Sequence, residues 1–119
     1  MIAKKYKLPI QNFVGKKPVA TKSSQFFVLK LFRLESDRGG RLENNHSRFG
    51  LVISGSVINK ATARNKIKRA VFDWLRLNKD KLPTYDYLFI LKNTAKDQKI
   101  EAVLNDLVQL SWLLVNNHS

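Results

Sequence analysis

Two patterns of hydrophobic and polar residues along the chain predict its secondary structure. Aromatic and branched residues dominate Ser24–Arg33, Arg48–Ser54 and Tyr85–Lys92, which is typical of β-strands. In the stretch from Ala63 to near Asn78, and again in Ala95–Val115, apolar residues recur at intervals of three and four, which predicts amphipathic helices. We therefore expect a mixture of strands and helices in one α+β domain.

Side-chain alternation along the first strand predicts that both of its faces are partly covered. One face carries Phe27, Leu29 and Leu31, and the other carries Phe26, Val28, Lys30 and Phe32. The polar residues 35–46 include the pair Gly39-Gly40, which favours a turn joining this strand to an antiparallel second strand.

The chain predicts a single domain over residues 1–119, in which residues 1–24 form an irregular, basic N-terminal segment. At most one short helix, roughly Pro9–Val14, fits within that segment. We expect Thr62 or Asn59 to cap the central helix, and Pro83 to prevent its continuation.

A helical wheel of the central helix separates an apolar side from a basic side. The apolar stripe, roughly 140 degrees wide, holds Ile67, Ala70, Val71, Trp74 and Leu75. The opposite side holds Asn65, Arg69, Phe72 and Arg76, with Lys66 and Lys68 on the flanks. We expect the stripe to dock on the sheet, so that cations point outward. Phe72 is then either a platform for a stacked base or a partly covered surface residue.

The net charge of the chain indicates what kind of molecule it binds. The chain has 22 Lys and Arg against nine Asp and Glu, a formal net charge of +13, which favours nucleic acid over an anionic membrane. Between Lys60 and Lys81 there are eight cations and two acids. A helix face that merely meets solvent usually mixes charges, so we interpret this face as a binding surface. Asn65 adds an amide able to contact phosphate, base or 2′-hydroxyl groups.

Other functions find little support in the sequence. The chain has no cysteine, and its first residues lead into no long apolar run, so we expect a soluble cytoplasmic protein that does not enter membranes. The two histidines, His46 and His118, are far apart and the acids are scattered. We therefore expect neither a metal site nor a catalytic site in the protein, and no small-molecule substrate.

Three segments together carry a family resemblance. These segments, followed by an amphipathic helix, are RFGLVIS (Arg48–Ser54), KATARNKIKRAVFDWLR (Lys60–Arg76) and YDYLFIL (Tyr85–Leu91). With them the chain resembles the protein subunit of bacterial ribonuclease P over about residues 13–115. The sharpest part is the run RNKIKR (Arg64–Arg69), which is similar to the Arg-Asn-Arg helix signature of that family.

The resemblance implies a fold and a function. The fold would be a small α/β sandwich of order αβββαβα with a mixed sheet, a left-handed βαβ crossover and kinship to ribosomal proteins. The protein would bind a catalytic RNA and the 5′ leader of precursor tRNA, and would support removal of the leader. Catalysis would belong to the RNA and its Mg²⁺ ions, so the protein would be a noncatalytic subunit without a cofactor of its own.

The resemblance also assigns residues by position. The side chains implied to bind the catalytic RNA are Lys60, Arg64, Asn65, Lys66, Lys68, Arg69 and Arg76. Those implied to line a leader-binding cleft between the first helix and the sheet are Phe13, Phe26, Lys30, Val52 and Phe72.

The chain departs from the family pattern at several of these places. Lys30 stands where an aromatic residue is common, Val52 where a small polar residue is common, and Phe72 where an arginine is common. Ser54-Gly55-Ser56 replaces the usual serine and two lysines, and residues 7–24 match the usual long first helix poorly. The alternative is a structural RNA-binding protein such as a ribosomal protein, but the helix signature favours ribonuclease P.

Overall fold

The computed structural model of the chain describes residues 6–13, 15–34 and 46–117. In chain order, with η for a 3₁₀ helix, its elements are η2 (Ile10–Phe13), β1 (Ala20–Ser23), β2 (Phe27–Phe32), β3 (Arg48–Val52), α1 (Ala61–Asn78), η5 (Lys79–Lys81), β4 (Asp86–Leu91), η6 (Asn93–Ala95) and α2 (Ile100–Asn117). Each of the three strands and two helices predicted from the hydrophobic rhythm is present, with its ends shifted by a few residues.

The sheet contains four strands in the order β1-β2-β4-β3. β2 pairs antiparallel with both β1 and β4, whereas β3 pairs parallel with β4. β2 and β3 therefore run in opposite directions, as expected, but β4 lies between them. The expectation that they form a neighbouring antiparallel pair is wrong, and the Gly39-Gly40 turn lies outside the described residues.

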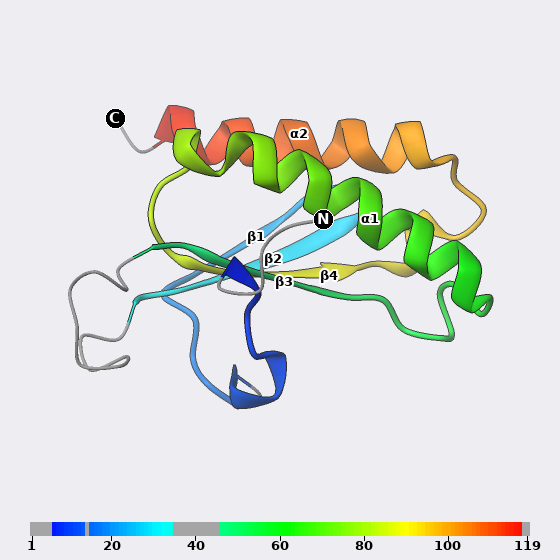
Figure 1. Cartoon of the computed structure of the whole chain (residues 1–119), viewed down its shortest axis with the longest axis horizontal. Helices are drawn as coiled ribbons and strands as arrows, with labels where there is room; N and C mark the ends of the chain where they lie inside the picture. The colour runs from blue at the N-terminus through cyan, green and yellow to red at the C-terminus, as the bar shows by residue number, and fades with distance from the viewer. Residues whose placement is uncertain (1–5, 14, 35–45, 118–119) are drawn as a thin grey trace.

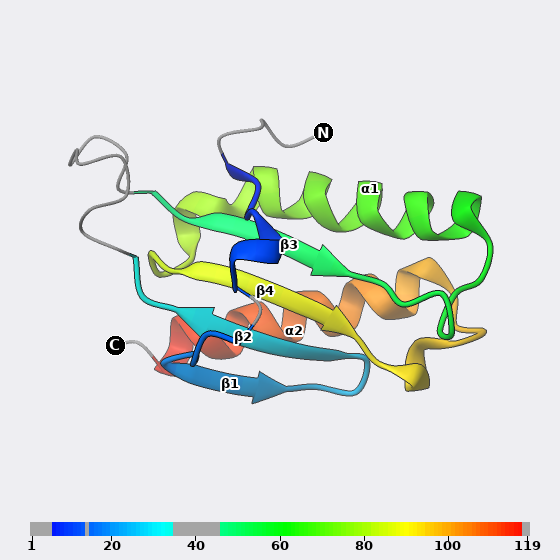
Figure 2. The same cartoon turned by 90° about the horizontal axis from the view of Figure 1, so that it is seen from below.

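The molecule has three layers. Both helices cover one face of the sheet, and the N-terminal segment with η2 lies against the other face (Figures 1 and 2). In Figure 2, which looks onto the face opposite the helices, β3 and β4 run the same way while α1 returns behind the sheet. With the strands turned to point upward, β4 lies to the right of β3, so the crossover is left-handed, as the resemblance implied.

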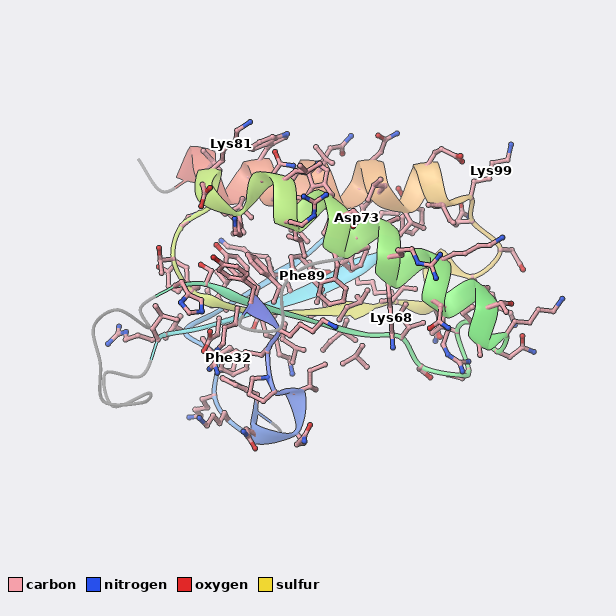
Figure 3. The ribbon with its side chains drawn as sticks, viewed as in Figure 1. Phe32, Lys68, Asp73, Lys81, Phe89 and Lys99 are labelled. Carbon is pink, nitrogen blue, oxygen red and sulfur yellow. The ribbon has the colours of Figure 1, made fainter. Side chains whose placement is uncertain are left out.

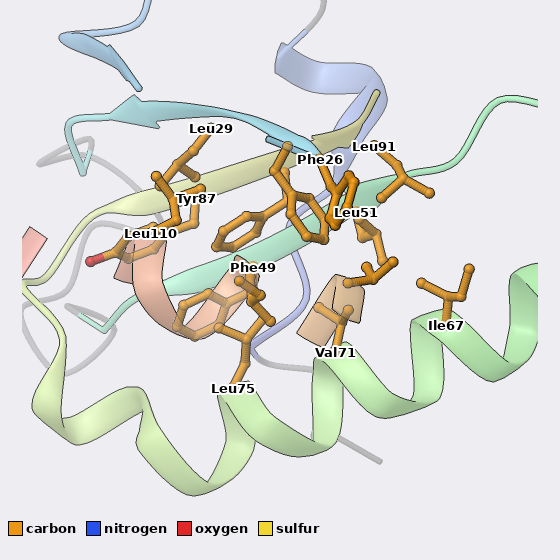
Figure 4. Packing of buried hydrophobic residues seen from close by; sticks show 14 of the residues in the cluster. Phe26, Leu29, Phe49, Leu51, Ile67, Val71, Leu75, Tyr87, Leu91 and Leu110 are labelled. Atoms are coloured by element: carbon orange, nitrogen blue, oxygen red, sulfur yellow. The ribbon is translucent and has the colours of Figure 1, made fainter. Parts of the chain in front are cut away.

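The main core lies between the sheet and the two helices. Ile67, Val71 and Leu75 of α1 point toward Phe49 and its neighbours on the strands (Figure 4). These side chains are buried, and each contributes ~1.5–3 kcal/mol of transfer free energy on leaving water. From the other helix, Val103, Leu107, Leu110 and Leu114 complete the cluster. The apolar stripes predicted for both helices are thus the surfaces that hold them on the sheet.

A smaller apolar cluster lies on the opposite face of the sheet. Its buried members are Leu8, Phe13, Phe32 and Leu88, and Ile10, Val52 and Ile90 pack against them. The first helix of the αβββαβα order is here only the single turn η2, directly after Pro9. It is short, yet it places Phe13 on the sheet with 6% of its surface exposed.

Strand β1 was not predicted from the residues themselves, although the implied element order includes it. Three of its four side chains are exposed, and it pairs only along one side, with β2. An edge strand of this kind buries no alternating apolar set, so its sequence carries no period-two signal.

The two ends of α1 differ from each other. Its first residue is Ala61, and the N-cap residue Lys60 makes no side-chain capping bond, so the expected capping by Thr62 or Asn59 is wrong. At the other end the Asn78 side-chain amide donates to the Trp74 carbonyl at 2.8 Å. The chain then passes through η5 and reaches Pro83, as predicted.

A buried tyrosine fixes the turn before β4. Tyr87 is fully buried, and its hydroxyl donates a hydrogen bond to the Pro83 carbonyl. Burial, with a smaller contribution from Tyr85, raises the pKa of the Tyr87 phenol far above its ordinary value. The hydroxyl therefore stays protonated and remains a donor.

Within the described part of the chain, no helix is both long enough and apolar enough to cross a membrane.

Candidate nucleic-acid interface

The outward face of α1 carries a row of polar and basic side chains. Asn65, Lys66, Arg69 and Arg76 are all exposed, and the single acid on this part of the helix, Asp73, is half-buried. Because the apolar stripe is packed on the sheet, the helix cannot rotate to hide these groups. The prediction that this side faces outward is confirmed for Asn65, Arg69 and Arg76, and Lys66, which was predicted on a flank, is exposed as well.

Arg64 has a different position from the other cations of the signature. Its Nη1 donates to the main-chain carbonyls of Ile58 at 2.8 Å and Asn59 at 3.1 Å. The guanidinium therefore ties the loop after β3 to the first turns of α1, and Lys60 at that junction is exposed. A structural anchor at Arg64 leaves no pattern in the sequence that distinguishes it from a binding residue.

A pocket of about 300 Å³ separates α1 from the N-terminal segment. Three segments line this pocket. They contribute Asn65, Lys68, Arg69 and Phe72 from α1, then Phe49, Gly50 and Leu51 from β3, and Lys7, Leu8 and Ile10 from the N-terminal segment. Lys68 is half-buried here, and Figure 3 shows it on the side of α1 that faces β3. Part of the basic signature thus faces this pocket.

Phe72 corrects the helical-wheel expectation. It was placed among the outward residues, but only 9% of its surface is exposed and it belongs to the main core. The reason is that α1 packs beside β3 at the sheet edge, with the N-terminal segment next to it. That neighbourhood widens the covered sector of the helix beyond its apolar stripe, so Phe72 is a wall of the pocket and not an exposed platform.

A second pocket, of about 350 Å³, lies on the open face of the sheet. It brings together Phe13, Lys30 and Val52, three of the residues predicted to share a cleft. Phe32 and Leu88 add apolar walls, and Ile10 and Lys16 border it from the N-terminal segment. Ile10 also lines the first pocket, so the two pockets lie next to each other with this residue between them.

Phe13 is held in place by one aromatic ring and two cations. Its ring meets Phe32 edge to face at a centroid distance of 4.9 Å, and the Lys16 Nζ lies 4.7 Å from its centroid. Arg48 lies over the same ring at 5.6 Å. These distances are within the range of cation–π attraction. Sequence reasoning missed Arg48 and Lys16 because their contacts join segments that are far apart in the chain or irregular.

A buried carboxylate orients Arg48. Asp86, which is fully buried, accepts from Arg48 Nε at 3.0 Å and from Nη2 at 2.8 Å. Such a fork-like pair restricts the plane of the guanidinium. Asp86 thereby fixes the group that rests on Phe13.

Phe26 does not lie in the cleft, so its placement there is wrong. It precedes β2 and belongs to the core on the helix-covered side, where Figure 4 shows it beside Leu91 and Leu51. Asp106 of α2 accepts hydrogen bonds from the Phe26 amide at 2.9 Å and from the Ser24 hydroxyl at 2.6 Å. These bonds bend the chain before β2, so the alternation of that strand does not extend back to Phe26.

Gly50 allows the N-terminal segment to lie close against β3. A Cβ at this position would stand 3.0 Å from Ile10 Cγ1 and 3.2 Å from Leu8 Cβ. The Leu8 amide donates to the Phe49 carbonyl at 2.9 Å, which places the segment directly beside the strand. A larger residue at Gly50 would push away the segment that forms one wall of both pockets.

Comparison with known proteins identifies the family. The family model described as Ribonuclease P matches residues 11–113, which is most of the chain. The chain belongs to the ribonuclease P family. The basic helix and the sheet fall within the matched range, as do most residues of both pockets, whereas Lys7, Leu8 and Ile10 precede it.

Curated relatives in this family are ribonuclease P protein components. That of Chromobacterium violaceum is 42% identical over 60 residues, which cover 50% of each chain. That of Haemophilus influenzae strain PittGG is 42% identical over 48 residues, 40% of each chain. The chain thus spans half or less of the length of these relatives in the aligned parts.

Solved ribonuclease P proteins have the same fold. A Staphylococcus aureus RNase P protein mutant with defective mRNA degradation activity superposes with a TM-score of 0.73 at 23% identity, covering 92% of this chain and 88% of that one. The Thermotoga maritima protein in complex with 1-(4-fluorophenyl)-2-thiourea gives 0.70 at 23% identity, covering 92% and 97%. The fold of this family member is therefore the ribonuclease P protein fold.

Histidine and acidic side chains do not gather in this family member where the structure describes it. No three of them, in residues 6–13, 15–34 and 46–117, lie close enough together to hold a metal ion.

Gly50 can be tested by substitution. Gly50→Val should loosen the N-terminal segment because its side chain would overlap Ile10 and Leu8. We expect trypsin to cleave after Lys16 several times faster than in the unchanged protein. Gly55→Val is the matched control, since a Cβ there meets nothing within 4 Å. Equal cleavage rates in both variants would contradict the assigned role of Gly50.

Proposed function

We propose that this chain is the RNA-binding protein subunit of ribonuclease P, acting in the cytoplasm. Bound to the catalytic RNA, it supports endonucleolytic removal of the 5′ leader from precursor tRNA. The family match supports the identity of the complex. The observation that carries the binding role is that three basic surfaces are neighbours: Arg69 belongs both to the exposed row of α1 and to the pocket beside β3, and Ile10 lines both that pocket and the cleft around Phe13.

In the proposed complex, α1 docks on the folded catalytic RNA. Arg69 and Arg76 can each grip a phosphate with two parallel hydrogen bonds, and Lys66 acts as a point charge. Because the helix is packed on the sheet, the spacing of these groups is set before binding. Less conformational entropy is then lost on association than with a flexible basic tail.

The cleft would hold the single-stranded leader. Unstacked bases bind well against apolar and aromatic surfaces, and the buried rings of Phe13 and Phe32 form such a wall in this pocket. Lys16 and Lys30 line the same pocket and can neutralise leader phosphates. The hydrolytic step belongs to the RNA and its Mg²⁺ ions. The proposed contribution of the protein is therefore to bind and align two RNAs.

Reconstitution with a bacterial ribonuclease P RNA tests the proposal. At low Mg²⁺ the RNA phosphates are poorly screened, so the unchanged protein should increase cleavage of precursor tRNA at the leader junction. Lys66→Glu with Arg69→Glu should weaken RNA binding roughly a hundredfold and lower the slope of log affinity against log salt by about two. Arg64 is left unchanged because its hydrogen bonds are structural.

The matched control is Lys81→Glu with Lys99→Glu, which changes the net charge equally. Both lysines are exposed and lie away from the outward row of α1 (Figure 3). This variant should retain most of the affinity. No stimulation by the unchanged protein, or equal losses in the two double variants, would contradict the proposal.

The same substitution, phenylalanine to alanine, can test the roles of the two faces of the sheet separately. Phe13→Ala should weaken binding of leader-bearing precursor about tenfold in the reconstituted complex, and should affect mature tRNA little, because the cleft loses one aromatic wall. Phe26→Ala removes the same ring from the helix-covered core, so it should lower stability without discriminating between the two tRNAs. Equal effects of Phe13→Ala on precursor and mature tRNA would contradict the proposal that the cleft binds the leader.

A further inference from the structure

A third pocket, of about 540 Å³, lies on the other flank of α1. It is formed by the loop after β3, the first turns of α1 and the segment that leads into α2. Figure 1 shows that both helices begin at this end of the molecule. The pocket shares no lining residue with the pocket beside β3 or with the cleft, although Lys66 at its rim also belongs to the outward row of α1.

The pocket has an apolar floor and a basic rim. Val57 and Ile67 are buried in the floor, at 5% and 6% exposure, and Ile58 and Ile100 are half-buried beside them. The rim carries three exposed lysines, Lys60, Lys66 and Lys96, and one acid, Asp97. Three cations against one anion favour an anionic ligand, and the floor favours one with a flat apolar part.

These features fit one class of ligand. The pocket volume is within the range of about 300–1,000 Å³ that is usual for small-molecule sites. A bare phosphate would leave the branched side chains of the floor in water, and an uncharged ring would not use the lysines. A nucleotide satisfies both, because its base can cover Ile58 and Ile100 while its phosphate meets the ammonium groups.

We propose that this pocket binds a nucleoside monophosphate unit, with the base on the apolar floor and the phosphate at Lys60, Lys66 and Lys96. The unit has two possible sources, a free mononucleotide or an unpaired nucleotide of the bound catalytic RNA. The second source rests on the proposed function, and the first does not. Lys96 is the informative residue because it has no part in the RNA surface of α1.

Titration with adenosine monophosphate, adenosine and inorganic phosphate tests the site, with backbone amide NMR shifts of Gly55 and of residues 96–98 as the readout. AMP should bind at least about tenfold more tightly than adenosine or phosphate alone, because only AMP uses both the floor and the rim. Lys96→Glu should weaken AMP binding by about tenfold, since the phosphate then meets a carboxylate. Lys81→Glu, with the same charge change at a distant exposed lysine, should not.

Asp97→Asn gives a change in the opposite direction. It removes the one rim anion and should tighten AMP binding several-fold. Asp97 has a positive φ of 67°, and asparagine tolerates this conformation as well as aspartate does, so the backbone should be undisturbed. An AMP affinity no higher than that for phosphate, or equal effects of Lys96→Glu and Lys81→Glu, would overturn the proposal.

A final experiment, which adds the bacterial catalytic RNA, distinguishes the two possible sources of the bound nucleotide. If the nucleotide belongs to that RNA, Lys96→Glu should weaken RNA binding as well as AMP binding. If the pocket takes a free nucleotide, Lys96→Glu should affect RNA affinity no more than Lys81→Glu does. Lys96 makes this distinction because, unlike Lys66, it lies outside the RNA surface of α1. Failure of the chain to bind RNA at all would contradict the proposed function alone, since the AMP titration contains no RNA.

Discussion

The packing of α1 on the sheet is the constraint on which the rest of the interface depends. Burial of Ile67, Val71 and Leu75 fixes the rotation of the helix about its own axis. Once that rotation is set, one flank of the helix faces the N-terminal segment, the other flank faces the segment before α2, and the remaining side faces solvent. The outward row of α1 and the pockets on its two flanks therefore follow from one buried stripe.

The N-terminal segment supplies a second constraint. It lies beside β3 because Gly50 has no side chain to hold it away, and it ends in the single turn that places Phe13 over the sheet. Arg48, held by Asp86, then rests on the Phe13 ring. A segment with little regular structure thus acquires a defined position from contacts with the sheet, and the cleft has a wall without a long first helix.

Periodic burial was predictable from the sequence, and irregular contacts were not. The stripe of α1 and the rhythm of the strands have a fixed period, so the outward position of residues such as Arg69 followed directly. Phe26 and Phe72 were placed incorrectly because each depends on a neighbour distant in the chain, Asp106 for the first and the N-terminal segment for the second. The anchoring role of Arg64 could not be predicted from the sequence either, because the sequence does not distinguish an arginine that hydrogen-bonds to its own loop from one that binds RNA.

The most direct measurement compares cross-linking to the catalytic RNA from each helix. Because the chain has no cysteine, a photo-crosslinker can be attached to a single new thiol, in Asn65→Cys on α1 or in Gln109→Cys on α2. Both residues are exposed, so the labels are equally accessible. The account predicts strong cross-linking from position 65 and little from position 109. Equal cross-linking, or stronger cross-linking from α2, would contradict it.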